Sequence, residues 1–287
     1  MIDINAIANA AAEHDKVPGT AGGFTKELPR EGVALLRLQS YVELGLHKSK
    51  NPTYKPTRNV LLRFELLHPD HIISGKKEDG TEYSFPDTVS VNLSIGGPTS
   101  RFGKLFSKMN YDNDASFMYQ LIGKAFLGSI SHNTVGEGKD AKTYVNIQDA
   151  KGEWTIGAPV MNVLDALGVP TDETKPVPVP ELQGEPQMFL YNKAGLTEDQ
   201  VKAMWDDIYI DGEYEAVEAT DTAPARPARS KNWIQNKIRE SVDYDGSITQ
   251  RVDLGNTLDL PEETTEEVIE STVTALADVD PLKALGL

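Results

Sequence analysis

The chain has 287 residues, 39% of them hydrophobic, and a formal net charge of -16, which allows a sizeable core in one or two domains. It contains no cysteine, which excludes disulfide bonds, thiolate metal ligands and a cysteine nucleophile. The N-terminal stretch lacks the features of a signal peptide, and no stretch approaches the roughly 20 apolar residues of a membrane-spanning helix. We therefore expect a soluble, cytoplasmic protein with no membrane partner.

The charge is distributed unevenly along the chain. The first 160 residues hold equal numbers of acidic and basic side chains, so the whole net charge of -16 lies in residues 161–287. Residues 21–110 carry a surplus of basic side chains. The overall pI of 4.7 therefore says little about whether the first part of the chain binds nucleic acid.

The sequence predicts a mainly β domain after an N-terminal arm of residues 1–24. Apolar residues alternate with polar ones in three segments, 34–42, 60–66 and 89–95, as half-buried strands require. Helical spacing follows in 100–109, and Asp114 is placed to cap a second helix. Two more strands are expected at 125–131 and 143–148. This order predicts an OB-fold-like five-stranded antiparallel barrel with inserted helices over residues 25–160.

The composition changes after Trp154. Residues 170–186 contain five prolines and predict a polyproline-like linker. A capping box at 197–200 and amphipathic spacing in 232–242 predict two short helices. We expect an α/irregular acidic C-terminal region, made of an extension over 161–252 and an acidic tail over 253–287.

A basic segment between the first two predicted strands is the most informative part of the sequence. It has no acidic residue from position 44 to 64, and its cations and aromatic ring suit phosphates and stacked bases respectively. The alternative is an ordinary solvated hairpin loop. The candidate binding residues of this loop are Lys48, Lys50, Tyr54, Lys55 and Arg58. Outward-facing Arg37, Tyr41 and Arg63 on the adjoining strands are expected to extend the surface.

The acidic tail ends in a few apolar residues, which suits a peptide that recruits a partner protein. Asp278 and Asp280 would keep it solvated and steer it, and Leu282, Leu285 and Leu287 would supply an anchor. Competition with DNA for the basic surface is a second role for such a tail. A plain solubilising tail is the alternative.

Signatures of catalysis or of metal binding are weak. His68, Asp70 and His71 carry zinc-ligating groups, but Pro69 constrains them and a turn is the preferred interpretation. Neither glycine-rich segment, 96–98 or 136–138, has the sequence context of a phosphate-binding loop. We therefore expect no enzyme activity, no cofactor and no metal.

Residues 120–130 (QLIGKAFLGSI) followed by 142–147 (KTYVNI) resemble a group of bacteriophage-encoded proteins regarded as single-stranded DNA-binding. The resemblance continues in 203–214 and 230–238. It implies an OB-fold protein that coats single strands during phage replication or recombination in an infected bacterial cell, with Lys142 and Tyr144 in its binding surface. The chain departs from the usual aromatic ending, because its last residue is Leu287, and without cysteine it lacks the zinc module of some phage binders.

Two hypotheses follow for the function. The first is sequence-independent binding of single-stranded DNA, with replication or recombination proteins recruited through the tail; a homo-oligomer is compatible with it. The alternative is an acidic protein-interaction or DNA-mimic protein, virion-associated or anti-defence, whose negative charge is itself the working surface.

Overall fold

The structure is a computed structural model that describes residues 28–49, 51–76, 80–136, 141–182, 185–217, 225 and 227–255. The chain divides into two compact units, Met1–Asp253 and Leu254–Leu287. The expected N-terminal arm and nearly all of the expected acidic tail lie outside the described residues. None of the described helices is long and apolar enough to cross a membrane.

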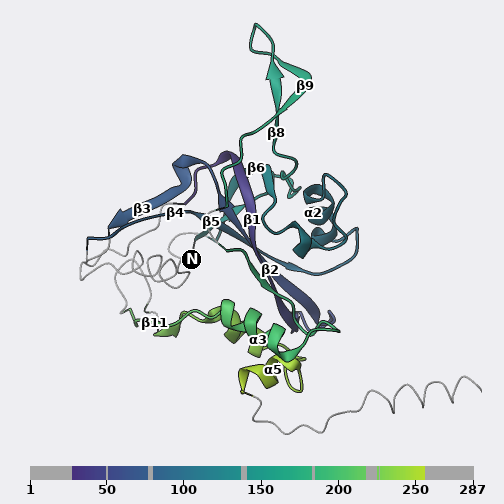
Figure 1. Cartoon of the computed structure of the whole chain (residues 1–287), viewed down its shortest axis with the longest axis vertical. Coiled ribbons are helices and arrows are strands. Elements are labelled where there is room, and N and C mark those ends of the chain that lie inside the picture. Colours follow the sequence, from purple (N-terminus) through teal and green to yellow (C-terminus); the bar gives the residue numbers. More distant parts are fainter. Residues whose placement is uncertain are drawn as a thin grey trace, which may run out of the picture. The chain divides into compact units, whose positions relative to one another are not determined.

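Five antiparallel strands form the centre of the first unit (Figure 1). In sheet order they are β5 (Thr88–Ser94), β2 (Thr57–Leu66), β1 (Gly32–His47), β6 (Ala125–Val135) and β7 (Lys142–Asn146). Strands β1, β2 and β5 form an antiparallel meander. Strand β6 pairs with the other edge of β1, and β7 pairs with β6. Helix α2 (Arg101–Met109) lies in the chain between β5 and β6. This arrangement confirms the predicted mainly β, OB-fold-like architecture.

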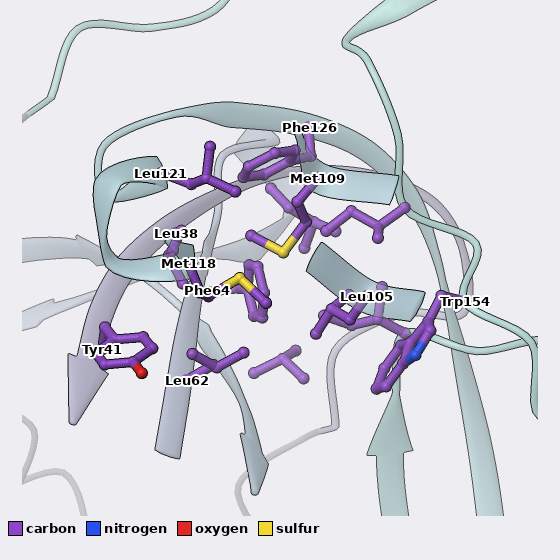
Figure 2. Close-up of a cluster of buried hydrophobic side chains, with 14 of the residues drawn as sticks. Leu38, Tyr41, Leu62, Phe64, Leu105, Met109, Met118, Leu121, Phe126 and Trp154 are labelled. Carbon is purple, nitrogen blue, oxygen red and sulfur yellow. The ribbon is translucent and has the colours of Figure 1, made fainter. Parts of the chain in front are cut away.

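Alternation along the strands builds the core of the barrel, as Figure 2 shows. Leu38, Leu62 and Phe64 point to the same inner face, where Phe126 of β6 meets Phe64 edge-on. Helix α2 covers this face with Leu105 and Met109. The Ser100 Oγ accepts a hydrogen bond from the Gly103 backbone N–H at 3.0 Å and so caps the helix. The second predicted helix is only a short 3-10 helix, η2 (Met118–Leu121).

A second apolar cluster lies on the outer face of β1 and β2. Residues 187–253, here called the C-terminal module, cover this face with β10 (Gln187–Phe189), α3 (Glu198–Asp207), α4 (Trp233–Arg239) and α5 (Ile248–Asp253). Strand β10 pairs in parallel with β1 at residues 40–42, beyond the point where β6 ends its pairing with β1. The predicted helices at 197–204 and 232–242 are therefore present, and both pack against the barrel through this cluster.

Two β-bulges in β1 decide which of its side chains face inward. The pairing with β2 shifts between Leu38 and Ser40 and again between Glu43 and Gly45. An extra residue reverses the alternation, so Tyr41 belongs to the inner cluster and Val42 to the outer one. A sequence pattern that ignores bulges assigns these two residues to the opposite faces.

Three two-stranded hairpins are inserted around the barrel. They are β3–β4 (Ile72–Lys76 and Glu82–Pro86), β8–β9 (Val160–Leu164 and Pro170–Pro176) and β11–β12 (Glu213–Tyr214 and Arg229–Ser230). The expected proline-rich linker thus begins as a strand, and its prolines at 170 and 176 stand at the two ends of β9, where a missing N–H costs least. The expected turn at the histidine pair is the 3-10 helix η1 (Pro69–His71).

Candidate nucleic-acid interface

The segment Lys48–Arg58, which is called the basic loop below, joins β1 to β2 and includes the first two residues of β2. Lys48, Tyr54, Lys55 and Arg58 are all exposed, and Tyr54 is 67% exposed. Among the described residues, neither Lys48 nor Lys55 forms an ion pair. The loop therefore presents two free cations and an aromatic ring, which are groups that bind phosphates and bases. Lys50 lies outside the described residues.

Local hydrogen bonds shape the tip of the basic loop. Asn51 Oδ1 accepts from the backbone N–H and the hydroxyl of Thr53 at 3.0 and 2.7 Å, and its carbonyl accepts from the Tyr54 N–H at 3.1 Å. Asparagine in such a turn replaces a backbone partner, and the following Pro52 restricts the chain further. The turn holds Tyr54 away from the barrel core.

The C-terminal module closes the base of the basic loop. Asp243 accepts a hydrogen bond from the Leu46 backbone N–H at 2.9 Å and pairs with Arg58 at 3.1 Å. The Val242 N–H also donates to the Leu46 carbonyl at 2.7 Å. Arg58 is therefore the one cation of the described loop whose charge is already matched by a carboxylate.

Polar side chains line the outer face of β5, and on the neighbouring β2 the polar residues Asn59 and Arg63 stand on either side of Leu61, which is buried in the outer apolar cluster. Register pairs Asn59 with Ser94 and Arg63 with Ser90, and the Ser94 hydroxyl donates to Asn59 Oδ1 at 3.0 Å. None of these side chains is acidic. We call this set the polar strip: Thr57, Asn59, Arg63, Ser90, Asn92 and Ser94. It extends about 13 Å from Asn59 to Arg63, at roughly 3.3 Å per residue.

Arg63 is the unusual member of the polar strip. It is partly buried, and among the described residues it has neither an ion pair nor a hydrogen-bond acceptor for its side chain. Burial lowers the pKa of its guanidinium from the usual value. A partly desolvated cation without a counter-charge attracts an anion from solution.

The expected outward orientation of Arg37 and Tyr41 is wrong. Arg37 is only 4% exposed, because residues 180–181 cross over it and accept hydrogen bonds from its guanidinium, and because Glu65 lies 4.0 Å away. Tyr41 is 3% exposed, since the first bulge turns it to the inner face, where it packs edge-on against Tyr119 and donates to Glu43 at 3.0 Å. Neither side chain is on the surface that a nucleic acid would contact.

The basic loop leads into β2, and Arg63 lies further along that strand, beyond the buried Leu61. The other predicted residues lie elsewhere. Tyr144 is 51% exposed on β7, which pairs with β6 and also contacts β5. Lys142 begins the same strand.

The tail residues Asp278, Asp280, Leu282, Leu285 and Leu287 lie outside the described residues. No group of three or more histidine, aspartate or glutamate side chains in the described chain is arranged to hold a metal ion.

The polar members of the strip on β5 were not among the binding residues predicted from the sequence. Ser90, Asn92 and Ser94 alternate with Val89, Val91 and Leu93, so the pattern predicts an outward face but gives no reason to connect it with the basic loop. The connecting signal is the pairing of Asn59 with Ser94, which depends on strand register.

Comparison with known proteins gives little further guidance. No family model matches the chain, and no curated protein matches it. A solved structure with some similarity is a deletion mutant of the single-stranded DNA binding protein from Thermus aquaticus, at 10% identity and a TM-score of 0.18. The match covers 48% of this chain and 64% of that one, which is less than two thirds of its length. At this TM-score the likeness carries no argument, and the interpretation of the fold rests on the strand order.

Proposed function

We propose that this protein binds single-stranded DNA without sequence preference, along the basic loop and the polar strip. In an OB-fold the second and third strands and the loop between the first two are the usual surface for an oligonucleotide. Here those elements are β2, β5 and the basic loop. Hydroxyl, amide and cationic groups recognise phosphate and sugar, and an aromatic ring stacks on any base.

The observation that carries the proposal is the uncompensated charge of Arg63. The chain has a net charge of -16, yet this partly buried guanidinium has no carboxylate partner among the described residues. The next residue on the same face of β2, Glu65, pairs with Arg37 instead. Leaving a cation in this state costs free energy. A phosphate bound there would recover that cost.

The cellular setting is a further part of the proposal. The resemblance in 120–130 and 142–147 supports a role in phage DNA replication or recombination. The acidic, leucine-ended tail supports the recruitment of other replication proteins. Within this proposal the protein acts by coating DNA and has no enzyme activity of its own.

The first test is fluorescence anisotropy of labelled oligothymidylate and of a matched duplex, at several salt concentrations. We expect tight binding to the single strand, which weakens with salt at a slope of about 0.7 for each phosphate contact. The full chain should be compared with a truncation after Gly255, because Asp253 belongs to α5 and bonds to Arg239 and Tyr244. Stronger binding by the truncated chain would indicate that the tail competes with DNA.

Replacing single cations tests whether DNA binds at the basic loop and the polar strip. Arg63→Ala should weaken binding about tenfold, the loss expected for a charge-assisted contact. Arg30→Ala is the matched control, because it removes the same charge from an exposed residue that pairs with Asp70 at 3.9 Å. Failure of both the full chain and the truncated chain to bind a single strand would reject the proposal and favour the acidic protein-interaction or DNA-mimic function.

A further inference from the structure

The acidic half of the chain contains one basic stretch that the function proposed above does not use. Residues 222–239 have no acidic side chain and include a tryptophan. The same combination, cations with an aromatic residue and no acid, marks the basic loop. The cations of this stretch are Arg226, Arg229, Lys231, Lys237 and Arg239.

In the hairpin β11–β12, two of these cations contact the ring of Tyr214. Arg229 pairs with Tyr214 in the register, and its guanidinium lies 5.0 Å from the ring centroid. Lys231, two residues later, places its Nζ 5.6 Å from the same centroid. Lys231 directly follows β12, and cation–π contacts hold both side chains at the Tyr214 ring. The hairpin thus presents two cations side by side.

Neither of these two cations is neutralised by a carboxylate within the described part of the chain. Two other cations of the same stretch are neutralised: Lys237 pairs with Glu240 at 2.8 Å, and Arg239 pairs with Asp253 at 2.7 Å. The nearby Glu213 pairs with Ser230 in the register, so it lies on the opposite face of the hairpin from Tyr214. Within the described residues, Arg229 and Lys231 therefore lack the counter-charge that an external anion would supply.

Trp233 supplies an exposed aromatic surface two residues after Lys231. It is the first residue of α4 and 44% exposed, whereas Ile234 and Ile238 of the same helix are buried in the outer apolar cluster. The other two tryptophans, Trp154 and Trp205, are only 5% and 4% exposed. Packing of the helix therefore does not account for the position of Trp233.

We propose that Arg229, Lys231 and Trp233 form a second contact site for single-stranded nucleic acid, on the C-terminal module. The two cations would hold phosphates and the indole would stack on a base. The inference rests on the function proposed above and extends it, because a strand held at the basic loop and the polar strip continues to a second site. It gives the C-terminal module a direct role in binding in addition to its packing on the barrel.

Tryptophan fluorescence tests the stacking contact. Because the other two tryptophans are buried, oligothymidylate should quench mainly Trp233 in the full chain, and Trp233→Phe should abolish most of the quenching. The phenylalanine ring keeps a stacking surface, so the affinity of this variant should fall less than that of Trp233→Ala. Circular dichroism checks that both variants are folded.

A charge variant tests the phosphate contacts. Arg229→Ala with Lys231→Ala should lower the affinity for a long oligothymidylate about tenfold and reduce the salt slope by about 1.4, the value for two contacts. Binding of a short oligothymidylate, which reaches only the first site, should be unchanged. The matched control is Lys76→Ala with Lys202→Ala, which removes two exposed cations that pair with Glu82 and Asp206.

The outcomes separate the inference from the function on which it rests. If the full chain binds single strands but the double variant binds long ones equally well and Trp233 is not quenched, the second site is rejected and the function stands. If neither the full chain nor the truncated chain binds a single strand, both are rejected. Tighter binding by the double variant would also reject the second site, because it would show that these cations hold an acidic part of the chain itself.

Discussion

The outer faces of β1 and β5 belong to the same sheet but have opposite surroundings. On β1, Val42 and Leu44 are fully buried beneath the C-terminal module. On β5, Ser90, Asn92 and Ser94 remain exposed. The part of the outer face on β1 is therefore a second core, and the part on β5 is a polar surface that reaches the basic loop through the contact of Ser94 with Thr57.

The same contrast separates the two arginines of the outer face. Arg37 lies where the chain crosses over β1, and it is matched by Glu65 and by backbone carbonyls. Arg63, on the neighbouring strand, has no such partner among the described residues. Burial with a partner indicates a structural role, and burial without one among the described residues is the observation on which the proposed phosphate contact rests.

The largest effect on stability is expected from the covered face. Phe189→Ala removes a fully buried ring that packs 5.5 Å from the ring of Trp205, so the free energy of unfolding should fall by about 3–5 kcal/mol. Urea unfolding followed by circular dichroism measures it. Asn92→Ala, on the exposed face of β5, is the control and should stay within about 0.5 kcal/mol. A loss below about 1 kcal/mol for Phe189→Ala would show that the module does not form a second core.

Breaking the buried Arg37–Glu65 pair should lower the free energy of unfolding nearly as much as Phe189→Ala does. Arg37→Met leaves the Glu65 carboxylate, 6% exposed, without its cation, at a cost of up to about 3–5 kcal/mol. Burial already raises the pKa of Glu65, and Arg37 opposes that rise. In the variant the pKa should rise further, so the penalty should be full at neutral pH and shrink as the pH falls and Glu65 becomes protonated. A penalty independent of pH would contradict this account.

A smaller loss of stability is expected at Asp253, the last residue of the C-terminal module. Burial acts to raise the pKa of Asp253, but hydrogen bonds from Arg239, Tyr244 and Trp205 outweigh it and leave the pKa below the usual value. The ionised form is thus stabilised by folding, and this contribution is lost as the pH falls through the lowered pKa.

Asp253→Asn tests this contribution. The variant should lose about 1–3 kcal/mol at neutral pH, the value of hydrogen bonds to a charged group. The difference between the variant and the natural chain should narrow below about pH 4, near the usual pKa of aspartate. Asp245→Asn, which alters an exposed contact with Gln250 at 3.2 Å, is the control and should change the free energy of unfolding by less than about 0.5 kcal/mol.

Much of the fold could be predicted from the sequence because its signals are local. Strand β5 and helix α2 follow directly from alternation and from helical spacing, and the capping box of α3 forms between Thr197 and Gln200 as predicted. The exposure of Tyr54 follows from its loop, which is short of apolar residues and contains two prolines.

What could not be predicted depends on contacts between distant parts of the chain. The burial of Arg37 requires residues 180–181, more than 140 positions away. The reversal at Tyr41 requires a bulge, which leaves no mark in the alternation of apolar residues. At the second bulge, Gly45 has a φ of +83°, and a Cβ there would lie 2.6 Å from the Ser241 Cβ. That glycine is needed because the C-terminal module packs against β1, which sequence periodicity does not reveal.

The smallest effect on stability, and the sharpest contrast with Arg37, is expected for Arg63→Gln. No ion pair is lost among the described residues and a partly buried charge is removed, so the free energy of unfolding should change by less than about 0.5 kcal/mol or rise. Binding of oligothymidylate should nevertheless weaken, because the phosphate loses its cation. Urea unfolding and anisotropy on the same preparations separate the two effects. If Arg63→Gln destabilised the protein as much as Arg37→Met does, Arg63 would be a structural residue and the polar strip would lose its central contact.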